Sequence, residues 1–274
     1  MKPQGNGDLF EALESEDFGV SFLSFLPWRD RLIQGLTIRY LEDATRSPFD
    51  LGQNTSPPRE DIRRNRDLFS KVIAGDKPLI ITMVQMHGNI VKIAGGVYGP
   101  LDTRWESVGP SDGVITDSED ALLIATIADC VPIFLFDPAR RVIGLLHAGW
   151  RGTAARIMQV GILRMGEAFG TDPTHLLIYL GPSIARSCYP VRPEVYRHFE
   201  PWVPRTPRPA EGWRVDLGGI NAAQAVEMGV SERNVHRSRY CTHCSPELFY
   251  SHRASQGHSG RMAAFLALRK QISS

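Results

Sequence analysis

Two histidines and one cysteine of this chain lie in short motifs where predicted strands meet loops. His87 lies in QMHG, Cys130 in ADCVP and His147 in HAGWRG. Two imidazoles and one thiolate suit Zn²⁺, and three protein ligands leave the fourth tetrahedral position open. A zinc ion held in this way acts as a Lewis acid and lowers the pKa of its water to about 7. These residue types therefore indicate metal-dependent catalysis at neutral pH.

The residues alone leave other interpretations open. His87, Cys130 and His147 are far apart in the chain and match no short zinc motif. They could be two ordinary histidines and a buried cysteine, since free cysteine is among the most buried residue types. Cys130 and His147 could also form a cysteine-hydrolase pair, with Asp129 or Gln85 as the orienting group.

Apolar segments rich in β-branched residues adjoin all three motifs, and they predict the strands that must position them. Asp137 and Pro138 supply a turn between two of these segments. The predicted strands are Leu79–Met86, Ala121–Ile127, Val131–Phe136, Arg141–Leu146 and Leu176–Leu180.

Helices are predicted from apolar residues at helical spacing and from capping residues. Asp61 begins a helix that stops at Gly75, and Thr153 caps a helix that ends near Gly170. Two further helices are predicted, near Asn221–Met228 and Arg261–Lys270.

Turn formers and proline predict loops at Ser47–Glu60 and Glu200–Gly212, and residues 1–18 read as a loose polar tail. Strands and helices alternate without the regular spacing of a doubly wound sheet. We therefore expect an α+β fold with mixed β-sheets flanked by helices, in a single domain over residues 19–274.

Composition excludes several classes of partner. The 274 residues are 42% hydrophobic and 22% charged, as in an ordinary globular protein, and the net charge is +1. This balance argues against nucleic acid or an anionic membrane as the main partner. The polar, acidic N-terminus does not resemble a secretory signal, and four cysteines do not suggest a disulfide scaffold. The expected location is the cytoplasm, as a monomer or a homodimer.

Taken in order, QMHG, ADCVP and HAGWRG resemble the YfiH-type laccase-domain family, also called the multicopper polyphenol oxidase or purine nucleoside phosphorylase family. The resemblance continues through LGPSIARSCYPV, DLGGINAAQAVEMGV, CTHCSPELFYSHR and GRMAAFLAL, and it runs from about residue 33 to the C-terminus. It implies a CNF1/YfiH-like fold. It also implies that His87, Cys130 and His147 bind Zn²⁺, with copper the less favoured metal.

The resemblance implies activity on purine nucleosides with phosphate as the second substrate. The reactions are phosphorolysis of adenosine, inosine and 5′-methylthioadenosine, and deamination of adenosine. Arg39, Arg151 and Arg261 occur in motif positions and are candidates to grip phosphate, because a guanidinium binds its oxygens in a fork. Trp150 is a candidate to stack on a purine, and Asp129 is a candidate for proton transfer.

Three alternatives to nucleoside chemistry remain at this stage. One is copper-dependent oxidation of phenols, which needs several clustered histidine-rich sites, whereas this sequence supplies a single one. The second is an editing hydrolase that acts on cell-wall precursors. The third is a non-catalytic metal-binding protein with a vestigial site.

Cys241 and Cys244 form a CxxC motif near the C-terminus. A single CxxC without a second pair is a weak indication of zinc or redox chemistry. His243, His252 and His258 follow closely in the sequence, so a second structural metal is an alternative. We expect these cysteines to be free thiols.

Overall fold

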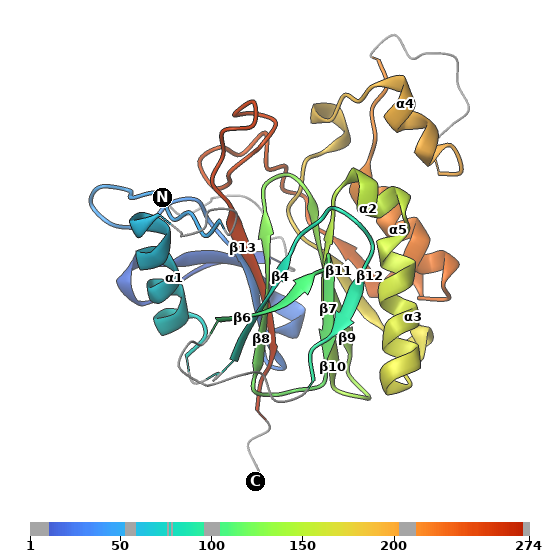
Figure 1. The fold of residues 1–274 in the computed structure, drawn as a ribbon, viewed down its shortest axis with the longest axis horizontal. Coiled ribbons are helices and arrows are strands. Elements are labelled where there is room, and N and C mark those ends of the chain that lie inside the picture. The colour runs from blue at the N-terminus through green and yellow to red at the C-terminus, as the bar shows by residue number, and fades with distance from the viewer. Residues whose placement is uncertain are drawn as a thin grey trace.

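Two β-sheets packed face to face form the centre of the molecule, and helices cover both outer faces (Figure 1). The computed structural model describes residues 11–52, 59–75, 77, 79–95, 105–202 and 212–270. From one side to the other, the layers are helix α1, a seven-stranded sheet, a six-stranded sheet, and helices α2, α3 and α5 (Figure 1). Both sheets are mixed, because each contains parallel and antiparallel pairs. The predicted α+β, single-domain fold is confirmed.

The seven-stranded sheet joins distant parts of the chain. Its order is β1 (Glu11–Ser15), β2 (Ser21–Phe25), β3 (Leu32–Thr37), β13 (Met262–Leu268), β8 (Ala121–Ile127), β4 (Leu79–Val84) and β6 (Trp105–Pro110). Strand β4 runs parallel to β8 and begins level with it, because Leu79 pairs with Ala121. Both strands therefore deliver their following residues to the same end of the sheet.

The six-stranded sheet contains the hairpin that ends at His147. Its order is β12 (Val235–Arg237), β11 (Leu177–Leu180), β9 (Val131–Asp137), β10 (Val142–Ala148), β7 (Gly113–Thr116) and β5 (Val91–Ile93). Every residue of β9 and β10 is buried. In β9, Phe134 and Phe136 face the other sheet, while Ile133 and Leu135 face the helices. Both faces are apolar because both are covered.

The α-helices lie outside the two sheets (Figure 1). They are α1 (Glu60–Val72), α2 (Trp150–Ala154), α3 (Ile157–Phe169), α4 (Pro193–Tyr196) and α5 (Leu217–Glu227). Short 3-10 helices occupy Asp17–Gly19, Leu26–Trp28, Pro173–His175, Arg186–Cys188, Arg197–Phe199 and Glu232–Asn234. The helices predicted after Asp61 and near Asn221–Met228 are confirmed within a few residues.

Two predicted features at the chain ends are wrong. Arg261–Lys270 is not a helix, because Met262–Leu268 forms β13 in the middle of the seven-stranded sheet. Its residues alternate between the two sides of that sheet, with Phe265 towards α1 and Leu266 towards the other sheet. The loose tail predicted over residues 1–18 is wrong where Glu11–Ser15 pairs with β2. Residues 1–10 lie outside the described part.

Thr153 does not cap the helix that ends at Gly170. It lies inside α2, its side chain is buried, and the residue before α3 is Arg156 in a left-handed conformation (φ 61°). The hydroxyl of Thr153 accepts a hydrogen bond from Nδ2 of Asn221, which ties α2 to α5. Much of the predicted loops at Ser47–Glu60 and Glu200–Gly212 lies outside the described residues, which omit 53–58 and 203–211.

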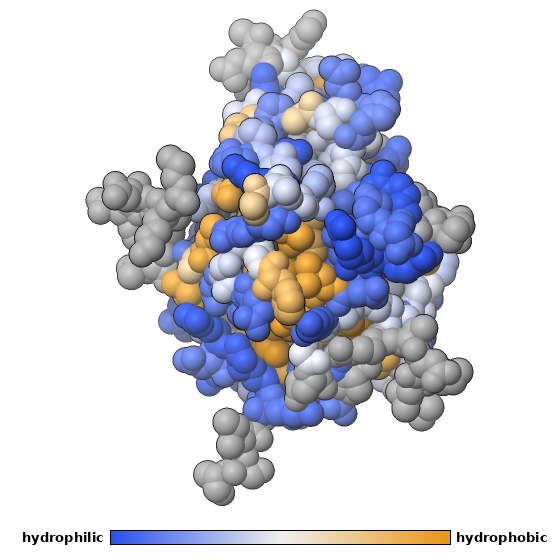
Figure 2. Space-filling view, turned by 90° about the vertical axis from the view of Figure 1, so that its left-hand side faces the viewer, coloured by the Kyte–Doolittle hydropathy of each residue, from blue (hydrophilic) through white to orange (hydrophobic). Residues whose placement is uncertain are grey.

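The surface on the α1 side is mostly hydrophilic, with apolar residues gathered in the middle of that face (Figure 2). Among the helices of the described residues, none is long and apolar enough to span a bilayer.

Candidate functional site

The three strand ends predicted to carry His87, Cys130 and His147 meet at one place. After β4, the amide of Gln85 continues the pairing with β8. Its Nε2 donates to the carbonyl of Thr126 at 2.9 Å, and its Oε1 accepts from the Thr126 N–H at 2.9 Å. His87 is thereby held beside the crossover from β8 to β9, where Cys130 lies.

The β9–β10 hairpin brings His147 to the same crossover. In its register, His147 pairs with Pro132 and Ala148 pairs with Val131. The last residues of β10 therefore lie next to the first residues of β9, and Cys130 immediately precedes β9. Sequence spacing could not show this proximity, because it depends on pairing between strands of two sheets.

The ligand atoms of His87, Cys130 and His147 all lie within 4.8 Å of one another. The two imidazole rings are edge to face, with centroids 4.9 Å apart. His147 is buried, Cys130 is half-buried and His87 is exposed, so the group opens to solvent on one side. A Cβ on Gly149 would lie 3.0 Å from Sγ of Cys130 and 3.2 Å from Cδ2 of His87. A side chain here would therefore press on both candidate ligands.

A fully buried carboxylate, Asp112, orients both histidines. Its Oδ1 is 2.9 Å from Nδ1 of His147 and accepts the backbone N–H of His87 at 2.9 Å. Its Oδ2 accepts the N–H groups of Met86 and Gly88. These bonds hold His87 in the left-handed region, at φ 59°, which costs a non-glycine residue about 1–3 kcal/mol. Because Nδ1 of His147 is engaged, its Nε2 is the nitrogen left to face the group.

The charges of the three side chains are coupled. Burial raises the pKa of the Cys130 thiol, but the charge and hydrogen bonds of His147 and His87 outweigh burial and lower it to about 6. Burial lowers the pKa of His147, but the Cys130 thiolate and Asp112 raise it to about 9. The two shifts favour the thiolate form of Cys130 and the protonated form of His147 when no metal is bound. A zinc ion that enters the group would find the thiolate prepared and would displace the proton of His147, because zinc binds neutral imidazole.

A cavity of about 260 Å³ opens in front of His87 and Cys130. Two predicted substrate residues line it: Trp150, and Arg151, whose guanidinium lies 4.3 Å from the Trp150 ring centre. Arg253 also lines the cavity and was not predicted from the sequence, although it ends the motif CTHCSPELFYSHR. Its guanidinium lies 4.9 Å from the ring centre of Tyr189, which also lines the cavity.

Asp129 lines the same cavity, but both of its carboxylate oxygens are engaged. Oδ1 accepts from the hydroxyl of Thr242 at 2.6 Å, and Oδ2 accepts from the N–H of Arg253 at 2.7 Å. Asp129 is 7% exposed. Its carboxylate ties the C-terminal loop to the crossover between β8 and β9. His252, next to Arg253, is exposed and lines the cavity.

Arg39 and Arg261 are not among the residues that line this cavity. Arg39 donates from Nη1 to the carbonyl of Pro246 and borders a different cavity of about 220 Å³. The guanidinium of Arg261 donates to the carbonyls of Ser259 and Gly260, and its backbone N–H donates to Asp50. Both arginines therefore bind the protein's own backbone rather than the predicted site.

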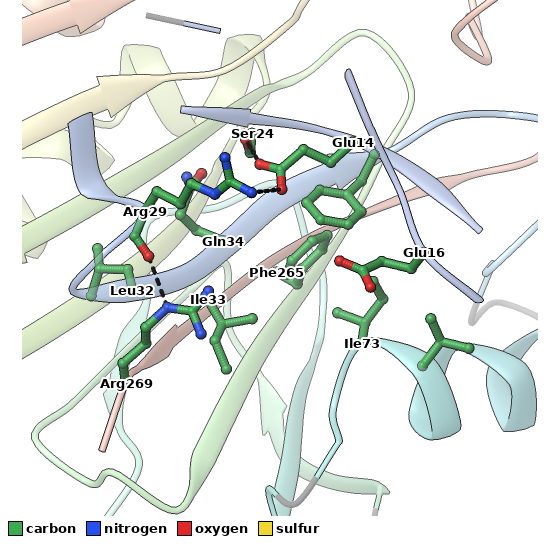
Figure 3. Close-up of a pocket in the computed structure, with 12 residues that line it drawn as sticks. Glu14, Glu16, Ser24, Arg29, Leu32, Ile33, Gln34, Ile73, Phe265 and Arg269 are labelled. Atoms are coloured by element: carbon green, nitrogen blue, oxygen red, sulfur yellow. Dashed lines mark hydrogen bonds and ion pairs between the residues drawn. The ribbon is translucent and has the colours of Figure 1, made fainter. Parts of the chain in front are cut away.

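Another cavity, of about 170 Å³, lies over the seven-stranded sheet between β1, β3 and α1 (Figure 3). Two of its charged residues pair with each other, Arg29 with Glu14 at 3.3 Å, and Nε of Arg269 donates to the backbone carbonyl of Arg29 at 2.8 Å. None of the His–Cys–His residues borders it. The cavity in front of Cys130 is therefore the better candidate site.

Known proteins resemble this chain over most of its length. The family model "Multi-copper polyphenol oxidoreductase laccase" matches residues 41–269. The purine nucleoside phosphorylase YlmD of Geobacillus stearothermophilus is 31% identical over 253 residues, which are 87% of this chain and 91% of the relative. A purine nucleoside phosphorylase of Bacteroides thetaiotaomicron is 30% identical over 219 residues, 77% of this chain and 81% of the relative.

Solved structures show the same fold. The crystal structure of YlmD from Geobacillus stearothermophilus superposes with a TM-score of 0.80 at 28% identity, covering 95% of this chain and all (100%) of the other. The YfiH protein of Bacillus licheniformis superposes with a TM-score of 0.79 at 24% identity, covering 94% and 99%. The match to most of the chain confirms the predicted resemblance: the protein belongs to the multi-copper polyphenol oxidoreductase laccase family, which includes the YfiH-type proteins.

Proposed function

We propose that His87, Cys130 and His147 bind one zinc ion and that the adjoining pocket catalyses phosphorolysis of purine nucleosides. The observation that carries the proposal is the open His–Cys–His group in front of a pocket with two arginines. Relatives named as purine nucleoside phosphorylases support the substrate class. Adenosine, inosine and 5′-methylthioadenosine are the proposed substrates.

The donor set fits zinc. Two nitrogens and one sulfur within 4.8 Å of one another, open on one side, match a catalytic zinc site with three protein ligands. Asp112 on Nδ1 of His147 is the type of carboxylate that fixes the orientation of zinc-binding histidines. Multicopper oxidation would need further histidine-rich groups, and the other group within the described residues contains a single histidine. A bound zinc ion would supply Lewis-acid chemistry next to the substrate.

The pocket's cations are placed to bind phosphate. The guanidinium groups of Arg151 and Arg253 lie against Trp150 and Tyr189, and all four residues border the cavity. Nη1 of Arg253 donates to the carbonyl of Pro190 at 2.9 Å, so this guanidinium offers its remaining N–H groups to phosphate. Arg151 can grip phosphate oxygens in a bidentate fork. The aromatic faces offer surfaces on which a purine ring can stack.

Proton transfer in this pocket is assigned to His252. Phosphorolysis joins a phosphate oxygen to C1′ and breaks the bond from C1′ to the purine nitrogen, and the departing purine takes up a proton. Asp129 was the predicted proton-transfer residue, but its two bonds to Thr242 and Arg253 favour a structural role. His252 is exposed in the cavity, and histidine is the side chain that most often serves in general acid–base catalysis.

Tyr189 can help to recognise the base. Burial and the nearby charge of Cys130 raise its pKa to about 12, so its hydroxyl remains a hydrogen-bond donor. We include hydrolytic deamination of adenosine in the proposal, because the same pocket could hold the purine next to a Lewis acid while water replaces the amino group at C6.

A nucleoside screen with and without phosphate tests this function. Each nucleoside is incubated with zinc-loaded protein, and free base, sugar 1-phosphate and deaminated nucleoside are separated by chromatography. Free base together with sugar 1-phosphate, formed only with phosphate, supports phosphorolysis. Free base without a phosphate requirement would contradict it, and inosine formed from adenosine without phosphate would support the deaminase activity.

A further inference from the structure

Cys188, His243 and Cys244 meet beside the pocket, outside the His87–Cys130–His147 group, and Cys241 adjoins them. The ligand atoms of Cys188, His243 and Cys244 all lie within 4.8 Å of one another. The sulfur atoms of Cys188 and Cys244 are 3.2 Å apart, although 56 residues separate them in the chain. The sulfur of Cys241 contacts that of Cys244 as well. The CxxC motif alone suggested free thiols, because it did not show that Cys188 joins it.

We propose that Cys188, Cys241, His243 and Cys244 bind a second zinc ion, which is structural. Structural zinc sites are tetrahedral, and three cysteines with one histidine are a common set. With zinc–sulfur distances of about 2.3 Å, sulfur ligands lie about 3.8 Å apart. Cys188 and Cys244, whose sulfurs are 3.2 Å apart, therefore need only a small movement, whereas the sulfur of Cys241, outside the 4.8 Å group, has to move closer to the other donors. The donors are sulfur-rich and contain no carboxylate, which favours zinc over magnesium or calcium.

The local backbone already prepares Cys241 as a ligand. The N–H of Ala185 points at its sulfur, with a nitrogen–sulfur distance of 3.3 Å. A hydrogen bond of this kind helps to orient a ligand atom towards a metal ion. The backbone around Cys241 therefore already holds its sulfur in place.

The group is open to solvent on one side. Zinc binds the thiolate form of cysteine, so a zinc ion that enters the group would displace the thiol protons. Cys244 is exposed and Cys188 is half-buried, so an ion can reach the group from solvent.

The position of the group gives it a structural role. Cys188 directly precedes Tyr189 of the pocket wall, and His243 directly follows Thr242, which donates to Asp129. Within the described residues, these two segments are joined by the N–H of Thr242 to the carbonyl of Ser183 and by a bridge between Ser183 and Cys241. A metal ion here would fasten the two loops that form one side of the pocket.

The C130S variant isolates this second site, because it removes the thiolate of the first one. The protein is purified under reducing conditions without chelator, and metals are measured by elemental analysis. We expect about one zinc per chain in C130S, and almost none when Cys244→Ser is added. His243→Ala in the C130S background should also lose the metal, whereas His258→Ala, a nearby exposed histidine outside the group, should retain it.

Cobalt provides a readout that does not depend on activity. When Co²⁺ replaces zinc in C130S, thiolate-to-cobalt charge-transfer absorption should appear, and it should vanish with Cys244→Ser. Cys244 is exposed and serine is similar in size, so the variant should stay folded, and circular dichroism checks this. A folded C130S protein without zinc and without this absorption would overturn the proposal. A Cys188–Cys244 disulfide found by mass spectrometry in the reduced preparation would overturn it as well.

Discussion

The carboxylate of Asp112 binds both histidines of the candidate metal site, one through its ring and one through its backbone. Its Oδ1 lies 2.9 Å from Nδ1 of His147 and 2.9 Å from the backbone nitrogen of His87. One buried residue between β6 and β7 thus fixes two ligands that are 60 positions apart in the chain.

Asp112→Asn should lower zinc affinity about 10- to 100-fold, because loss of a carboxylate partner of a zinc-binding histidine typically has this effect. Zinc affinity is measured by competition with a chromophoric chelator. Asp117→Asn, a change at an exposed aspartate a few residues away, serves as the matched control and should leave the affinity unchanged. Equal affinities of the D112N and wild-type proteins would show that Asp112 does not position the ligands.

Gly149→Ala should disrupt the metal site for steric reasons alone. The added Cβ would lie 3.0 Å from Sγ of Cys130, whereas the φ of Gly149, −75°, is open to any residue. We expect zinc content to fall by at least half, with a modest loss of thermal stability. Gly166→Ala in α3 is the control, because its Cβ would meet nothing closer than 3.5 Å and alanine favours helix by about 1 kcal/mol. Full zinc occupancy in the G149A variant would refute the proposed packing.

In the metal-free protein, Cys130 should ionise well below an ordinary thiol. The difference in ultraviolet thiolate absorbance between wild type and C130S should rise with a midpoint near pH 6, the value to which His147 and His87 lower the pKa against burial. His147→Ala should move the midpoint upwards, because it removes the largest of these lowering effects. A midpoint above about pH 8, as in a free thiol, would disprove the thiolate–imidazolium pair.

The shifted pKa values of Cys130 and His147 make stability depend on pH in opposite directions. The lowered pKa of Cys130 contributes stability that is complete above its unfolded value and is lost as pH falls through about 6. The raised pKa of His147 contributes stability that is complete below its unfolded value and is lost as pH rises through about 9. Between the two, proton release and uptake nearly cancel. The contribution of this pair to the free energy of unfolding of the metal-free protein should therefore stay level with pH over this range. A steep slope that C130S and H147A both abolish would contradict this expectation.

Arg151→Gln and Arg253→Gln should each raise the KM for phosphate at least about tenfold, because a lost charged hydrogen bond is worth about 1.5–3 kcal/mol. Arg39→Gln should leave this KM unchanged, since Arg39 borders a different cavity. Initial rates at varied phosphate and saturating nucleoside provide the measurement. A phosphate effect confined to Arg39→Gln would favour the original prediction from the sequence.

The sequence predicted the residues that meet but not everything that surrounds them. Strand ends marked by His87, Cys130 and His147 were recognisable, because apolar β-branched runs stop at each motif. Asp112 was not, because its role depends on pairing between β7 and β10, where the Asp112 carbonyl accepts the His147 N–H. Arg253 was missed for a similar reason, since it lies 124 residues after Asp129 in the chain and only the folded C-terminal loop brings it to the pocket.

Strand β13 shows the limit of pattern analysis. MAAFLAL contains methionine, alanine and leucine, which favour helices, and all seven residues are buried. With both faces covered, the alternation of polar and apolar residues that marks a strand is absent. Only its position between β3 and β8 makes the segment extended.

Sugar 1-phosphate formation from inosine, followed as zinc is added back to metal-free protein, is the most direct test of the central claim. The rate should rise from near zero as the His87–Cys130–His147 site fills, and it should level off once that site is full. The same protein with Cys130→Ser should stay inactive at every zinc concentration. Full phosphate-dependent turnover by the metal-free protein would contradict the account, and would favour a cysteine-based mechanism for Cys130 and His147.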